Sequence, residues 1–138
     1  MAKPRRPIVT GSGRLAPPHS AADDTNTLKP HFSLEHLAVG DDFDLTACNQ
    51  QGRAEFAVAI RDRSRMTWAE IMRAPRQGLG FEKIGSLNVT IPGTVPADKR
   101  GRIVAFRFGQ LARFLGYRDG RVFHVLWIDP AGRCYSHE

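Results

Sequence analysis

The sequence contains few cysteines and lacks any long apolar run. Its 138 residues include only Cys48 and Cys134, which lie far apart and form no C-x-x-C pair. This pattern argues against a disulfide framework or a zinc site and favours a reducing compartment. No apolar stretch approaches the roughly 18 residues that a membrane helix needs. Residues 11–14 also interrupt any signal-peptide core behind the basic N-terminus. We therefore expect a cytoplasmic protein.

The familiar catalytic motifs are missing as well. The sequence has no phosphate-binding G-x-x-x-x-G-K-[ST] loop, no H-E-x-x-H pair and no nucleophile elbow. Its five histidines, at positions 19, 31, 36, 124 and 137, include no pair spaced i, i+4 on a predicted helix. The sequence therefore predicts no metal and no cofactor.

The positive charge is divided between a short tail and the rest of the chain. The formal net charge is +6, with 20 basic against 14 acidic residues. Residues 1–30 hold five basic and two acidic side chains (net +3), which leaves 15 against 12 (net +3) for residues 31–138. Residues 1–30 are rich in proline and show no apolar period, which is typical of disorder. The sequence therefore predicts a disordered basic tail over 1–30, serving an acidic partner or solubility, and a single domain over 31–138.

Two helices and several strands are expected in the domain. Alternation over His31–Leu37 predicts a strand, and an apolar stripe over Arg53–Arg63 predicts a helix. The segment Thr67-Trp-Ala-Glu70 has the pattern of a capping box, so a second helix should begin there, with Trp68 in the core and Pro75 as its stop.

The C-terminal third carries the clearest strand pattern. Three strands are expected over 102–108, 112–117 and 121–129, with Asp119-Gly120 as a hairpin turn and the last strand central because it is apolar on both faces. Residues 81–84 and 87–91 are further candidate strands. The predicted fold class is α+β: a mostly antiparallel sheet of four to five strands, with two helices packed on one face.

The stretch Phe106–Pro130, together with His31–Leu34 and Met66–Ile71, resembles a group of small bacterial and phage proteins that end in a hairpin of the form R-x-x-G-[YF]-R…FH-[IV]-L-[WF]-[ID]-D-P. Within that group the chain is similar to SocB-like toxins, the toxin half of the SocA/SocB toxin–antitoxin pair. The resemblance implies a non-enzymatic toxin that occupies the DNA polymerase sliding clamp and blocks replication elongation. It also implies an antitoxin, SocA, that acts as an adaptor to the ClpXP protease.

A clamp-binding segment is expected at Gln110–Leu115. Bacterial clamp-binding peptides have the pattern Q-L-[SD]-L-F or Q-x-x-L-x-[LF]; the Gln amide enters a small polar pocket and the apolar residues fill a cleft. In this segment Gln110 would be the polar anchor, Arg113 would meet acidic clamp surface, and the apolar plugs would be Leu111, Phe114 and Leu115. If this segment is a paired strand, adjacent side chains point to opposite faces, so the motif requires an edge or a loop.

Two other functions remain open. Small basic toxins of the ribosome-dependent RNase class combine a curved sheet with two helices, and their chemistry needs a proton acceptor and cations for the phosphate. The residues available for it near the hairpin are Arg113, His124, Tyr135 and His137. Outside that chemistry, His124 is expected to be a hydrogen-bonded core residue. The third hypothesis is a nucleic-acid-binding module. Direct nucleic-acid binding is nevertheless not expected, because no aromatic residues interleave with the basic residues of the tail.

Overall fold

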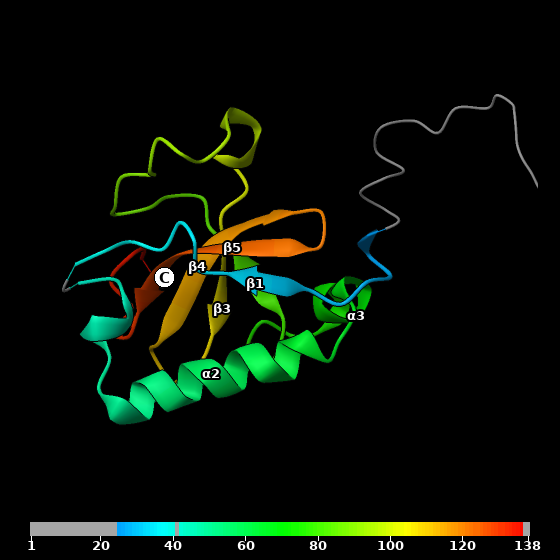
Figure 1. Ribbon diagram of the computed structural model, residues 1–138, viewed down its shortest axis with the longest axis horizontal. Coiled ribbons are helices and arrows are strands. Elements are labelled where there is room, and N and C mark those ends of the chain that lie inside the picture. Colours follow the sequence, from blue (N-terminus) through cyan, green and yellow to red (C-terminus); the bar gives the residue numbers. More distant parts are fainter. Residues whose placement is uncertain (1–24, 41, 137–138) are drawn as a thin grey trace, which may run out of the picture.

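The computed structural model describes residues 25–40 and 42–136, so the predicted disorder of residues 1–24 lies outside the described residues (Figure 1). In the described part of the chain, no helix is long and apolar enough to cross a membrane. The helices are α2 (Gln50–Ser64) and α3 (Trp68–Arg73), with short 3₁₀ turns η2 (Leu45–Ala47) and η3 (Ala97–Lys99). The strands are β1 (His31–Ser33), β2 (Phe81–Lys83), β3 (Val104–Arg107), β4 (Arg113–Asp119) and β5 (Val122–Asp129).

The five strands form one mixed sheet in the order β1-β5-β4-β3-β2. Strands β2 to β5 pair antiparallel, and only β1 pairs parallel, with β5. The predicted α+β class with a mostly antiparallel sheet is therefore confirmed, and β5 is an interior strand as expected. The β4–β5 turn contains Gly120 at φ 63°, a left-handed conformation that glycine adopts without steric cost. The outer strands β1 and β2 are only three residues long.

Both helices pack on the same face of the sheet. Helix α2 begins earlier than predicted because the Asn49 side chain accepts a hydrogen bond from the Gly52 amide (2.8 Å). Helix α3 has the predicted capping box between Thr67 and Glu70. Trp68 is 1% exposed and donates its indole N–H to the Arg121 carbonyl, which confirms it as a core residue. The two helices cover a buried cluster whose largest members are Phe56, Trp68, Ile71, Phe106, Phe114 and Phe123.

The other face of the sheet is covered by irregular chain. Figure 1 shows α2 along one side of the sheet and the β2–β3 connection extending from the opposite side. Residues 87–91 were a candidate strand but pair with no strand. Their alternating apolar side chains, Leu87, Val89 and Ile91, pack on the second buried cluster instead. The Asn88 amide donates to the Cys134 carbonyl, which holds this cover against the end of the chain.

The chain contacts the domain before the predicted boundary at residue 31. The Ala69 amide donates to the Asn26 carbonyl, and the Trp68 amide donates to the Leu28 carbonyl. Residues 25–30 therefore pack along α3, on the helix side of the sheet.

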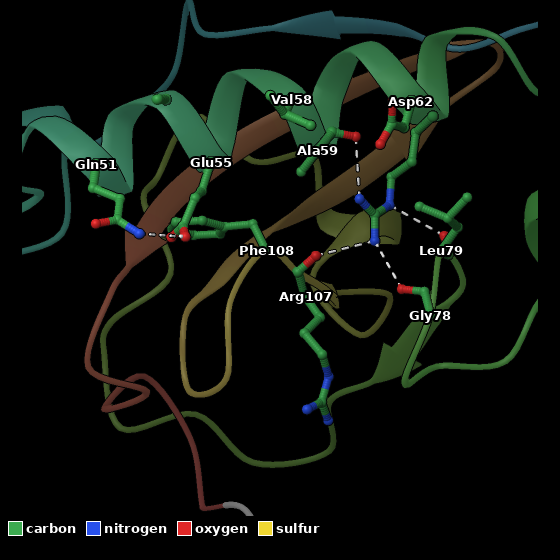
Figure 2. Close-up of a pocket in the computed structure, with 11 residues that line it drawn as sticks. Gln51, Glu55, Val58, Ala59, Asp62, Gly78, Leu79, Arg107 and Phe108 are labelled. Atoms are coloured by element: carbon green, nitrogen blue, oxygen red, sulfur yellow. Dashed lines mark hydrogen bonds between the residues drawn. The ribbon is translucent and has the colours of Figure 1, made fainter.

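Arg63 is the charged residue buried in the helix-side core. It is 1% exposed, and its guanidinium donates to the carbonyls of Ala59, Gly78, Leu79 and Arg107, each at 3.1 Å (Figure 2). The guanidinium also lies 4.9 Å from the Phe106 ring centroid. Burial lowers the pKa of the Arg63 side chain to about 10, so the group stays charged at neutral pH. These contacts fasten α2 to the segment before β2 and to β3.

Replacing this cation should destabilise the whole domain. Arg63→Met keeps an apolar chain of similar length but leaves four carbonyls without their donor, so we expect a loss of about 3 kcal/mol in the free energy of unfolding. Urea denaturation measures this directly. Arg61→Met is the matched control on α2, because the Arg61 side chain is 54% exposed; its effect should stay within about 0.5 kcal/mol. Equal effects of the two substitutions would contradict the structural role of Arg63.

Candidate functional site

The hairpin end of the loop-covered face gathers polar residues from β1, β4 and β5. Strand β1 was predicted to continue to Leu37 but ends at Ser33, because the chain turns there. The Glu35 amide donates to the Ser33 hydroxyl, and the Leu37 amide donates to the Leu34 carbonyl. Since Ser33 is in register with His124 on β5, the turn brings His36 beside His124.

Two imidazoles and one phenol ring lie together at this position. The ring centroids of His36 and His124 are 5.5 Å apart, and the Tyr117 ring stacks on His124 at 4.8 Å with an interplanar angle of 22°. The Nδ1 atom of His124 is buried and has no hydrogen-bond partner within the described residues. His124 is therefore not the satisfied core histidine that its strand position suggested.

The backbone at this position depends on Gly116. Strands β4 and β5 shift register here, from the pair Leu115–Trp127 to the pair Gly116–Val125. A Cβ atom on Gly116 would lie 1.9 Å from the His124 carbonyl oxygen, so only glycine allows this approach. The shift sets the position of His124 relative to Tyr117 on the sheet face.

The surroundings favour the neutral form of His124. Burial and, second, the nearby His36 lower the pKa of His124 below its usual value of 6.5, while Asp119 and Glu35 oppose that change. Burial likewise raises the pKa of the Tyr117 hydroxyl. At neutral pH, His124 is therefore an uncharged imidazole with an unpartnered buried nitrogen.

Charged groups of both signs surround the two rings. His36 Nε2 lies 3.8 Å from a Glu35 carboxylate oxygen, an ion pair whenever the ring is protonated. The Lys99 ammonium, on η3, lies 4.0 Å from an Asp119 carboxylate oxygen at the end of β4. This end of the sheet thus holds two imidazoles, two carboxylates and an ammonium. No spacing in the sequence indicates this cluster, since His36 and His124 meet through the parallel pairing of β1 with β5.

The predicted clamp-binding residues are divided between the surface and two separate cores. Gln110 and Leu111 lie in the β3–β4 loop and are exposed, Leu111 by 58%. Phe114 and Leu115 are both 0% exposed, Phe114 in the helix-side cluster and Leu115 in the cluster on the other face. Arg113 is 5% exposed and donates to the carbonyls of Gln110 and Ala112. The structure therefore does not bring these five side chains to one surface.

The residues named for RNA cleavage are also divided. Arg113 lies beside Tyr135, whose hydroxyl contacts a Glu82 carboxylate oxygen at 3.3 Å. Burial raises the pKa of the Tyr135 hydroxyl, and Arg113 opposes that change. His124 pairs with Tyr117, about 13 Å along β4 from Arg113 at the usual rise per residue. His137 lies outside the described residues.

A groove runs between α2 and the start of the β3–β4 loop. It encloses about 380 Å³. Its apolar lining includes Val58, Leu79 and Phe108, and Glu55 and Asp62 supply its acidic groups. Figure 2 shows the Arg107 side chain pointing away from α2. Phe108 in the groove belongs to the helix-side cluster, whereas Tyr117, which stacks on His124, belongs to the other cluster, so the groove and the imidazole pair lie on different faces.

No cluster of three metal-ligand side chains is found among residues 25–40 and 42–136. Cys48 and Cys134 are both free and buried. Burial raises the pKa of each thiol, most strongly at Cys134. Neither sulfur therefore offers a reactive thiolate at neutral pH.

The burial of Phe114 predicts a specific stability pattern. Phe114→Ala removes a fully buried ring and should lower the free energy of unfolding by about 3–5 kcal/mol. Leu111 is 58% exposed on the adjoining loop, so Leu111→Ala should change the free energy of unfolding by no more than about 0.5 kcal/mol. Urea denaturation of the two variants measures both values. If Phe114→Ala left the free energy of unfolding almost unchanged, the Phe114 side chain would have to lie at the surface.

Comparisons of the chain with family models, curated proteins and solved structures find no match. The similarity to SocB-like toxins therefore stays a prediction.

Proposed function

We propose that this domain cleaves RNA through the His36–His124 pair, the enzymatic alternative that the sequence left open. The observation that carries the proposal is the 5.5 Å separation of the His36 and His124 ring centroids. Two imidazoles this close can serve as proton acceptor and proton donor to one phosphodiester that lies across their edges.

The reaction would be an internal phosphoryl transfer. One imidazole takes the proton from the ribose 2′-hydroxyl, and the 2′-oxygen forms a bond to phosphorus. The bond from phosphorus to the 5′-oxygen breaks, and the second imidazole donates its proton to that oxygen. The products are a 2′,3′-cyclic phosphate and a 5′-hydroxyl, and the two histidines exchange their protonation states.

The surroundings assign a role to each ring. His124 is the proton acceptor, because burial and the nearby His36 keep it neutral. His36, the other imidazole of the pair, is then the proton donor. Tyr117 is a positioning residue that holds the plane of His124 by stacking.

The architecture supports this proposal by analogy. The chain is small and basic, and two helices lie on one face of its mostly antiparallel sheet. Ribosome-dependent RNase toxins have a similar architecture. A fold shared by many activities cannot identify a reaction, so the weight lies on the histidine geometry.

Removing either imidazole should abolish cleavage. His36→Gln and His124→Gln each remove one proton-transfer group, so the cleavage rate of a single-stranded or ribosome-bound RNA should fall by at least about 10². The rates are measured on labelled RNA with purified full-length protein. His31→Gln is the matched control, because His31 is an exposed histidine at the start of β1, and it should retain the full rate.

The pH dependence separates a proton-transfer role from a structural one. Because the pKa of His124 lies below 6.5, its neutral form persists to lower pH than that of an ordinary histidine. The acid limb of kcat/KM should therefore bend below pH 6.5, and this bend should disappear in His124→Gln. Full activity in both histidine variants, with normal folding by circular dichroism, would contradict the proposal.

A second candidate function is the clamp-binding toxin, and the exposure of Gln110 and Leu111 favours it. The Gln110 carbonyl accepts hydrogen bonds from Arg107 and Arg113, which fixes the β3–β4 loop with both residues at the surface. The groove beside α2, which has an apolar lining and two carboxylates, adjoins this loop through Phe108. Under this second proposal, the β3–β4 loop and the groove would contact the sliding clamp, in place of a continuous peptide. SocA and ClpXP would be further partners of the toxin.

A binding titration against purified sliding clamp tests this second function. Gln110→Ala with Leu111→Ala changes only exposed loop positions, so the fold should persist while clamp binding is lost. Arg61→Ala, exposed on α2, is the control and should bind as the parent protein does. Unchanged binding by the loop variant, or no binding by the parent protein, would rule out this loop as the contact.

A further inference from the structure

Three basic side chains line one cavity at the β4–β5 turn. The cavity encloses about 200 Å³ and is lined by Thr25, Lys99, Arg102, Arg118 and Gly120. Its cations come from η3, from the segment before β3 and from β4, and no carboxylate is among the lining residues. Cations converging from three segments create a positive potential that attracts an anion.

Arg118 is held in place before any ligand arrives. Its guanidinium donates to the Gly120 carbonyl (2.7 Å), to the Asn26 amide oxygen (2.6 Å) and to the Thr25 hydroxyl (3.0 Å). It also lies 4.4 Å from the centroid of the Trp68 ring. None of these partners is negatively charged, so the charge of Arg118 is fixed in position but not neutralised by them.

Lys99 and Arg102 supply the other two positive charges of the cavity. The Lys99 ammonium lies at 4.0 Å from both Asp98 and Asp119, the outer limit of an ion pair, so these carboxylates hold it only weakly. Arg102 is exposed. The Asp119 carboxylate also acts on His124, whose pKa it raises electrostatically. One residue therefore links the basic cavity to the imidazole pair around the end of the hairpin.

We infer that this cavity binds a backbone phosphate of the RNA strand, next to the phosphodiester that the histidines cleave; this inference rests on the proposed function. Arginine is suited to phosphate because its planar N–H groups match the phosphate oxygens. A strand that crosses the hairpin end would place one phosphate against the edges of the two imidazoles and a neighbouring phosphate against Lys99 and Arg102. The cavity would fix the register of the strand without reading its bases.

The test is binding of a fluorescent, uncleavable 2′-O-methyl RNA to the full-length chain, followed by anisotropy at several salt concentrations. Each lost phosphate contact should reduce the slope of log affinity against log salt by about 0.7, which is about fivefold in affinity at 0.1 M salt. We expect this change for Lys99→Gln and for Arg102→Gln. Arg61→Gln removes the same charge from the exposed face of α2, outside the cavity lining, and should leave the slope unchanged. Equal slopes for all three variants would overturn the inference.

The outcomes distinguish the cavity from the cleavage reaction. Because the probe cannot be cleaved, reduced slopes in a protein that cuts no RNA would support the phosphate site and reject the proposed function. Cleavage by the parent protein with unchanged slopes would reject the phosphate site alone. Inorganic phosphate, added at constant ionic strength, should compete only weakly. Complete displacement of the RNA by free phosphate would overturn the inference in favour of a small-anion ligand.

Discussion

The arrangement of the domain depends on the hydrogen bonds of Arg63. A charge buried in a protein core is costly unless its donors are satisfied, and here all four partners are backbone carbonyls from three separate segments. Because one belongs to α2 itself, two to the segment before β2 and one to β3, the helix has a single position on the sheet. The aromatic cluster beneath it, including Phe106 and Phe114, then closes on that side.

The candidate site lies on the opposite, loop-covered face of the sheet. Irregular chain covers most of that face with apolar side chains, but at the hairpin end the cover gives way to His36, His124 and Tyr117. The short parallel strand β1 is responsible, since its pairing with β5 and the turn after Ser33 bring His36 to the end of the sheet. The basic cavity at the same end adds positive charge, which the proposed RNA substrate would require.

Local signals in the sequence predicted the elements that depend on neighbouring residues. The capping box at Thr67 and the Asp-Gly turn at 119–120 were recognisable because their hydrogen bonds and backbone angles are set within a few residues. Asn49 was an equally local signal, an N-cap that would have placed the start of α2 correctly. The alternation over 87–91 correctly indicated one buried side, but such alternation also arises where an unpaired segment packs on a sheet.

The candidate site was harder to predict because it depends on distant pairing. Burial of Phe114 and Leu115 on opposite faces follows from strand alternation, once Arg113–Asp119 is known to be a paired strand. The meeting of His36 with His124 follows from the parallel register of β1 with β5, which no local pattern encodes.

The chemistry of the cleaved RNA ends tests the central claim most directly. Purified protein is incubated with a defined oligoribonucleotide, and the products are identified by mass spectrometry, with the His124→Gln variant prepared in parallel. Attack by the 2′-oxygen predicts 2′,3′-cyclic phosphate and 5′-hydroxyl ends that are absent from the variant. Products with 3′-hydroxyl and 5′-phosphate ends, or equal cleavage by the variant, would contradict the proposed role of the two histidines.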